Sequence, residues 1–252
     1  MSAPVPTSLV FTPPAVAREF GETTLRVVSA REDRAQLIAV RHAAFRQAGR
    51  LEPKAGVEDS CDDADHTVHV GAFKGATAHG AMRVTMKSWT DPISVLPCAA
   101  HFPAICSAGL RKLSIMEMSH LATDPRLGEQ AGAAIHAALV RAALLAAQAA
   151  RIAMLVTAAP AGRAAYYGQL LRFHPIGTPA PYPPGSELFT LTGGSMVGAA
   201  GRSIARHSFF VTAEHEIASM RSELLRCLSI APNTRQPFGA GDGARPNPGR
   251  GV

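Results

Sequence analysis

The chain has 252 residues, 47% of them hydrophobic, so it is long enough for one packed domain flanked by tails. Its formal charge is +6, but the basic residues are mainly dispersed arginines without interleaved aromatics, which argues against a nucleic-acid surface and favours an acidic partner or substrate. The cysteines lie far apart, without CxxC spacing or clustered histidines, so neither a metal site nor a disulfide framework is predicted. They are Cys61, Cys98, Cys106 and Cys227.

The ends of the chain differ in composition from its middle. Residues 1–20 begin with a Pro-, Ser- and Thr-rich stretch, and residues 231–252 are mostly Gly, Pro, Asn and Arg. Such segments bury too little apolar surface to offset the entropy of ordering them, so we expect disordered tails. The folded domain is predicted to span 21–230, with 193–230 as a C-terminal helical extension. The absence of a signal-peptide pattern and the cysteine usage predict a cytoplasmic protein.

Hydrophobic periodicity predicts strands that alternate with helices. In chain order these are strand 24–29, helix 31–47, loop 48–65, strands 66–73 and 80–86, an irregular segment 92–109 with a short helix near 103–108, strand 113–121, turn 122–128, helix 129–150, strand 152–158, helix 160–171, strand 173–177, a Pro-rich loop, strand 187–192 and helix 213–228. The order predicts an α/β (α+β) fold with a mixed central sheet flanked by helices.

The helix predicted at 129–150 is apolar enough to resemble a membrane span. His136, Arg141 and Gln148 interrupt it, and alanine dominates its composition. We therefore expect a buried helix and no stable membrane insertion.

Glu117 lies inside an apolar strand, between Met116 and Met118, and by alternation its side chain faces away from theirs. A buried carboxylate of this kind is suited to take a proton from an attacking amine. The alternative is a structural carboxylate paired with an arginine such as Arg41 or Arg83.

Two further features are compatible with a thioester donor. The small residues 128–132 open the long helix with free backbone N–H groups that suit a phosphate, although such residues also serve close packing and Asp124 could simply cap the helix. Tyr166 and Tyr167 follow on the next helix, where one hydroxyl could protonate a leaving thiolate, or both could be packing residues.

Arg41 and Arg83 stand in otherwise apolar contexts, where a guanidinium needs a carboxylate. Asp62 and Asp65, in the acidic loop before a strand, are the candidates within the chain. The pairing could hold that loop in place or leave an arginine to bind an acidic substrate.

The segment YYGQLLRF, on the helix after the second core strand, resembles the "LYEKLGF"-like motif of Gcn5-related N-acetyltransferases (the GNAT fold). Over residues 24–192 the chain resembles more closely two branches that take acyl groups from acyl carrier protein. These are the N-acyl amino acid synthases of the FeeM type and the acyl-homoserine-lactone synthases. VRHAAF, the acidic pair, GAMRV and MEMSHLATDP look like their helix, loop and strand motifs.

The resemblance implies an acyltransferase, with roles for individual residues. Glu117, Tyr167 and Ser119 would be catalytic. Arg41, Phe45, Arg83 and His120 would bind the acceptor. Leu121, Ala122, Thr123, Gln130, Ala131 and Gly132 would bind the donor. The implied donor substrate is an acyl-phosphopantetheine, carried by acyl carrier protein or CoA, with no bound cofactor and no metal.

Several departures from the family patterns refine this expectation. His120 replaces the usual Arg and puts a titratable group near the site. The turn 126–132 departs from the Gly-rich acetyl-CoA loop, which favours an acyl carrier protein donor. The resemblance to the FeeM type implies an amino acid as the acceptor. The alternatives are an acyl-homoserine-lactone synthase, an acetyl-CoA-dependent N-acetyltransferase and a non-catalytic module that binds acyl carrier protein.

Overall fold

The structure is a computed structural model that describes residues 9–10, 23–29, 31–51, 59–183, 187–196 and 208–234. The predicted tails, 1–20 and 231–252, lie outside these ranges, apart from the short strand at Leu9–Val10 and the end of the last helix. That helix runs to Thr234, beyond its predicted end at Leu228.

A nine-stranded mixed sheet forms the centre of the fold, as the alternating pattern predicts. Its path is β1-β2-β3-β4-β5-β6-β9-β7, with β8 beside β9; β5 and β6 are parallel, and every other pair is antiparallel. The strands are β1 (Leu9–Val10), β2 (Thr24–Val28), β3 (Thr67–Lys74), β4 (Thr77–Lys87), β5 (Ile115–Thr123), β6 (Met154–Pro160), β7 (His174–Pro175), β8 (Ala180–Pro181) and β9 (Leu188–Ser195).

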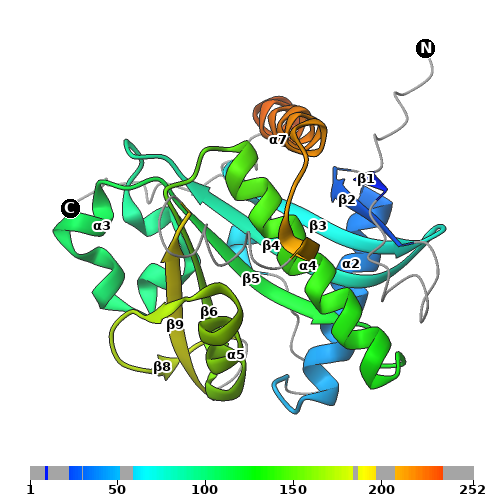
Figure 1. Ribbon diagram of the computed structural model, residues 1–252, viewed down its shortest axis with the longest axis horizontal. Coiled ribbons are helices and arrows are strands. Elements are labelled where there is room, and N and C mark those ends of the chain that lie inside the picture. The colour runs from blue at the N-terminus through cyan, green and yellow to red at the C-terminus, as the bar shows by residue number, and fades with distance from the viewer. Residues whose placement is uncertain are drawn as a thin grey trace, which may run out of the picture.

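Helices cover both faces of this sheet (Figure 1). The long helices α4 and α7 cross one face, and α2 lies behind the other. The helices are α2 (Arg31–Gln47), α3 (Ala108–Arg111), α4 (Glu129–Ala149), α5 (Ala161–Leu171) and α7 (Glu214–Thr234). The 3₁₀ turns are η1 (Ser60–Asp63), η2 (Ile93–Val95), η3 (Pro97–Ala100), η4 (Pro103–Cys106) and η5 (Ser208–Phe210).

The helix that resembles a membrane span is a core helix in this fold. Within the described ranges, α4 is the one helix long and apolar enough to cross a membrane, and 67% of its most apolar window is buried inside the protein. Arg141 is satisfied there by Glu216 of α7 and by the carbonyl oxygens of Phe209 and Val211. The charged residue that interrupts the apolar sequence of α4 thus makes a tertiary contact with α7.

Some element bounds differ from the prediction for local reasons. β5 continues to Thr123, so Ala122 and Thr123 belong to the strand and not to the turn. The strand predicted at 173–177 shortens to two residues, since Pro175 has no N–H to donate and Gly177 turns the chain with φ +76°. The Pro-rich loop contains β8, and the irregular segment before β5 is built from short 3₁₀ turns.

β5 contains a bulge where His120 and Leu121 oppose the single residue Met82. Ser119 pairs with Arg83 and Ala122 with Ala81, which leaves two residues of β5 against one of β4. His120 adopts φ +50°, a left-handed conformation uncommon outside glycine. As a result, Ser119 and His120 both reach side chains on the α2 side of the sheet.

Close packing of α4 on β4 depends on Gly80. A Cβ at this position would lie 2.5 Å from Ile135 Cγ2 and 3.0 Å from Leu139 Cδ1, both on α4. We expect Gly80→Ala to lower the free energy of unfolding by about 1–3 kcal/mol, because α4 must move away from the sheet. Gly109→Ala is the matched control, since a Cβ there meets no atom within 4 Å. Chemical denaturation of both variants measures the difference, and equal stabilities would contradict this account.

Candidate active site

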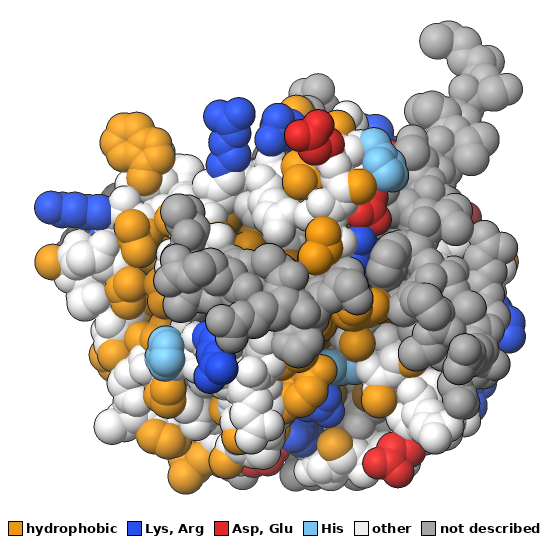
Figure 2. Space-filling view, viewed as in Figure 1, with side chains coloured by type: hydrophobic (Ala, Val, Ile, Leu, Met, Phe, Trp, Pro, Cys, Tyr) orange, Lys and Arg blue, Asp and Glu red, His pale blue; other side chains and the backbone are white. Residues whose placement is uncertain are grey.

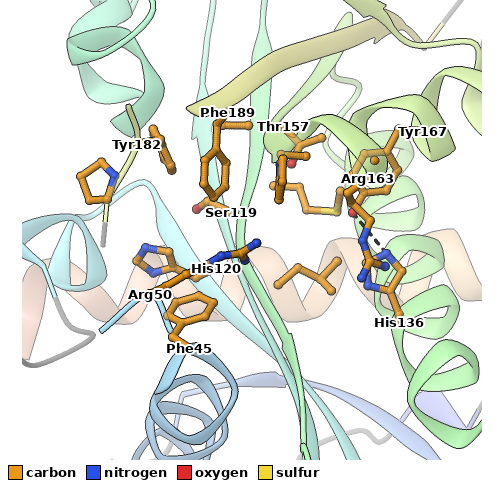
Figure 3. Close-up of a pocket in the computed structure, with 17 residues that line it drawn as sticks. Phe45, Arg50, Ser119, His120, His136, Thr157, Arg163, Tyr167, Tyr182 and Phe189 are labelled. Atoms are coloured by element: carbon orange, nitrogen blue, oxygen red, sulfur yellow. Dashed lines mark hydrogen bonds between the residues drawn. The ribbon is translucent and has the colours of Figure 1, made fainter. Parts of the chain in front are cut away.

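A cavity opens where the two parallel strands separate. β5 and β6 pair only from Ile115–Met154 to Glu117–Val156. Beyond that point the residues of both strands line a cavity of about 290 Å³ (Figure 3). Its lining residues are Phe45, Arg50, Met118, Ser119, His120, Leu121, His136, Thr157, Ala158, Ala159, Pro160, Gly162, Arg163, Tyr167, Tyr182, Pro183 and Phe189.

Glu117 is fully buried beside this cavity and is not one of its lining residues. Its side chain faces away from Met116 and Met118, which pack under α4, as alternation predicts. Oε1 accepts a hydrogen bond of 2.7 Å from the Tyr182 hydroxyl, and Oε2 accepts one of 2.8 Å from the backbone N–H of Cys98. The carboxylate is therefore held by these two groups, and neither Arg41 nor Arg83 is its hydrogen-bond partner.

Arg41 and Arg83 instead meet Asp62 in a buried ion network. Arg41 donates two bonds to the Asp62 carboxylate, of 2.9 and 3.0 Å, and Arg83 reaches both Asp62 and Asp59. Both guanidinium groups are fully buried, and neither lines the cavity. Arg83 also donates to the Ser119 hydroxyl at 3.0 Å. The network ties η1 to α2 and β4, and it reaches the cavity through Ser119.

The charge of Asp62 is set by this network. Burial alone would raise the pKa of Asp62, but hydrogen bonds and charge from Arg41, together with the charge of Arg83, outweigh burial and lower the pKa. Asp62 is therefore ionised at neutral pH.

His120 lines the cavity as a neutral ring. Arg41 Nη2 lies 2.6 Å from His120 Nδ1, and a guanidinium can only donate, so Nδ1 is the acceptor and the proton is on Nε2. Burial, followed by the charges of Arg83 and Arg41, lowers the pKa of His120 well below its usual value. The histidine at the position where the resemblance implies an arginine is thus an uncharged group at neutral pH.

The other end of the cavity holds Tyr167, His136 and Arg163 (Figure 3). The Tyr167 hydroxyl lies 3.2 Å from His136 Nε2, and both side chains are buried. Burial raises the pKa of Tyr167, while burial and the charge of Arg163 lower the pKa of His136 to about 3. Tyr166 is exposed and is not a lining residue. One of the two adjacent tyrosines therefore faces the cavity, as their helical spacing predicts.

The predicted donor-binding residues lie in two places. Leu121 lines the cavity, whereas Ala122 is buried in the cluster under α2. Thr123 lies beside the first turn of α4, where a Cβ on Gly132 would be 3.8 Å from its hydroxyl. Gln130, Ala131 and Gly132 form that first turn, and Gly128 gives it no side-chain cap. Asp124 bonds Arg126 within the preceding turn and does not cap the helix.

Four lining residues are not predicted as site residues by the sequence. Arg50 and Tyr182 stand in loops, Arg163 stands on a helix, and His136 is noticed in the sequence only as a polar interruption of an apolar helix. Tyr182 is preceded and followed by proline, a pattern that predicts only a loop. Within the described ranges, no group of three or more His, Cys, Asp or Glu side chains is arranged to hold a metal ion.

Comparison with known proteins identifies the family and the fold. The profile of the family described as "N-acyl amino acid synthase FeeM" matches residues 36–191. The structure of FeeM, an N-acyl amino acid synthase from uncultured soil microbes, is similar with a TM-score of 0.61 and 16% identity, covering 74% of this chain and 94% of that chain. No curated protein sequence matches.

Two further solved structures share the fold. The acyl-homoserine-lactone (AHL) synthase LasI has a TM-score of 0.56 at 16% identity, over 72% of this chain and 93% of that one. TofI, in a ternary complex with an inhibitor and MTA, has a TM-score of 0.55 at 16% identity, over 75% and 99%. The GNAT-like acyltransferase fold expected from the resemblance is thereby confirmed.

Removing the charge of Asp62 tests the buried network. We expect Asp62→Asn to lower the free energy of unfolding at pH 7 by about 3–5 kcal/mol, because two guanidinium groups remain buried with less compensating charge. The pKa of Asp62 is lower in the folded than in the unfolded chain, so its contribution is fully present above pH about 4 and is lost as the pH falls toward the folded value. The difference in the free energy of unfolding between wild type and Asp62→Asn, measured by chemical denaturation, should therefore become smaller as the pH is lowered from 5 to 3.

The matched control is Asp63→Asn, which removes a carboxylate from the exposed pair with Arg34. That change should alter stability by less than about 0.5 kcal/mol. An Asp62→Asn variant as stable as this control would contradict a structural role for the network.

Proposed function

Because the chain belongs to the FeeM family of N-acyl amino acid synthases and is therefore an N-acyltransferase, we propose that it moves a fatty acyl group from acyl carrier protein to the amine of an amino acid. One observation carries the proposal. The cavity between the separated strands has a carboxylate behind one end, at Glu117, and a buried phenol at the other, at Tyr167. An acyl transfer to an amine needs a proton acceptor and a proton donor placed in this way.

The separated strands suit an extended thioester donor. Backbone groups of β5 and β6 beyond Glu117 and Val156 have no partner in the other strand, so the amide groups of a phosphopantetheine arm can bond them. Met118, Leu121 and Ala159 supply an apolar wall for the acyl chain.

The arm's phosphate would lie outside the cavity. The first turn of α4 has no side-chain cap, its N-terminus carries a partial positive charge, and Arg126 and Arg163 are exposed cations. Figure 2 shows Lys and Arg side chains dispersed over one face of the protein. With a net charge of +6, the chain favours an acidic protein such as acyl carrier protein as the donor.

The acceptor would occupy the end near Tyr182. The guanidinium of Arg50 lies 5.3 Å from the centre of the Phe189 ring, and this ring packs against Tyr182. An amine near Glu117 thus brings the carboxylate of an amino acid close to Arg50, which replaces the buried Arg41 and Arg83 as the direct partner. The acceptor would share this guanidinium with Glu187, whose Oε2 accepts a bond of 2.8 Å from Arg50 Nε.

In the reaction, the amine attacks the thioester carbonyl carbon and its proton passes to Glu117. The C–S bond then breaks, and the thiolate is stabilised by the Tyr167 hydroxyl, which can give it a proton. Tyr167 holds its proton until the thiolate forms, because burial raises the pKa of this phenol. Neutral His136 orients the hydroxyl.

The proposed activity is tested by product formation from purified protein. Dodecanoyl- and hexadecanoyl-acyl carrier protein, and the same acyl groups on CoA, are incubated with the twenty amino acids and the products identified by mass spectrometry. We expect N-acyl amino acids from the carrier-bound donors, and a rate about 10²–10⁴-fold lower for Glu117→Gln.

Three outcomes would overturn parts of this proposal. Formation of acyl-homoserine lactones when S-adenosylmethionine is supplied would show that S-adenosylmethionine, and not an amino acid, is the acceptor. Faster reaction with the CoA thioesters would assign a different donor. Full activity of Glu117→Gln would remove Glu117 as the proton acceptor.

The adjacent tyrosines provide a matched pair for the leaving-group step. Tyr167→Phe should lower kcat about 10- to 100-fold while leaving the KM for the amino acid within threefold, because the hydroxyl acts on the departing thiolate. Tyr166→Phe should have kcat within twofold of wild type, since Tyr166 is exposed and outside the cavity. Equal rates for the two variants would exclude the Tyr167 hydroxyl from the reaction.

A further inference from the structure

Tyr182 stands between the cavity and Glu117. Glu117 is fully buried and does not line the cavity, whereas Tyr182 lines it and donates its hydroxyl proton to Glu117 Oε1. Oε2 accepts a bond from the backbone N–H of Cys98, which cannot carry a proton from the substrate, and the buried Cys98 thiol, which also bonds the carboxylate, does not line the cavity. Tyr182 is thus a residue of the cavity wall that bonds the carboxylate directly. Resting on the proposed function, we propose that Tyr182 relays the proton of the attacking amine to Glu117.

The surroundings hold Tyr182 in the position that a relay requires. The residue is 4% exposed, and its ring packs against three others, with centroid distances of 5.2 Å to His101, 5.7 Å to Phe102 and 5.7 Å to Phe189. A hydroxyl that donates to Glu117 keeps its oxygen lone pairs free to accept a proton. Ring packing and the bond to Glu117 thus hold the Tyr182 hydroxyl and the Glu117 carboxylate in place for proton transfer before the substrate binds.

Cys98, whose backbone N–H bonds the other oxygen of Glu117, is held in place by contacts that do not involve Tyr182. Cys98 lies in η3, in the segment between β4 and β5, and its side chain is fully buried. Lys87, at the end of β4, holds this segment by donating to the carbonyl oxygens of Ser88, Arg111 and Leu113. The carboxylate therefore cannot turn toward the cavity without losing the Cys98 bond.

The proton balance is simple. As the amine nitrogen bonds the thioester carbonyl carbon, its proton moves to the Tyr182 oxygen, and the original hydroxyl proton moves to Glu117 Oε1. Tyr182 ends the step as a phenol and Glu117 as a carboxylic acid. Burial and the charge of Glu117 raise the pKa of Tyr182 well above its usual value, so the step begins from a protonated phenol and passes through no free tyrosinate.

The test compares Tyr182→Phe, Glu117→Gln and the double variant in the full chain, with dodecanoyl-acyl carrier protein and the mixture of twenty amino acids as substrates. Tyr182→Phe keeps the ring packing and removes the relay oxygen. Its kcat should fall about 10²–10³-fold, with the KM for the amino acids within threefold and the melting temperature within a few degrees of wild type. The double variant should be no slower than Glu117→Gln, because both residues act in one proton path.

Each other outcome has a definite meaning. A Tyr182→Phe enzyme within threefold of wild type, beside an impaired Glu117→Gln enzyme, overturns the relay and leaves the proposed function standing. Losses that multiply in the double variant assign Tyr182 a separate, packing role and also overturn the relay. If wild type makes no acyl amino acid from any acyl carrier protein or CoA donor, the proposed function fails and the relay fails with it. Tyr166→Phe controls for loss of a hydroxyl elsewhere on the protein.

Discussion

Parallel hydrogen bonding between β5 and β6 stops at the pair of Glu117 and Val156, and the arrangement of the site depends on that stop. Up to this pair, the strands belong to a continuous sheet packed between helices. Beyond it, the two strands diverge and their residues line the cavity. Buried backbone groups left without a partner are costly, so a site of this kind suits an extended ligand that carries its own amide groups. The bulge at His120 and Leu121 falls on the diverging part of β5 and turns two successive side chains to one face.

The Asp62 network supplies orientation more than stability. A buried ion pair gains little net free energy over apolar packing, because desolvation of the charges offsets their attraction. What this network does is geometric. It joins η1, α2 and β4, directs Arg83 at Ser119, and sets the tautomer of His120 through Arg41. Two residues of the cavity wall are therefore positioned by charges that do not themselves reach the cavity.

Burial keeps most titratable groups along the cavity uncharged. His120 and His136 are neutral rings, and Tyr167 and Tyr182 retain their protons, each because its surroundings disfavour the charged form. The cations on the wall are Arg50, near Tyr182, and Arg163, near Tyr167. The cavity wall is therefore uncharged along most of its length, with an arginine near each of the two tyrosines, and Arg50 is itself paired with Glu187.

The sequence by itself determined the sheet, the order of its helices and the orientation of Glu117, because periodicity records which side of each element is buried. It also singled out Arg41, Arg83 and Asp62, since charges in apolar contexts need one another. Only the tertiary structure decided that these charges satisfy each other away from the cavity, that Tyr167 and not Tyr166 faces it, and that Tyr182 donates a hydrogen bond to Glu117. The reason is that Tyr182 and Glu117 are 65 residues apart and meet through a Pro-rich loop whose path local sequence does not specify.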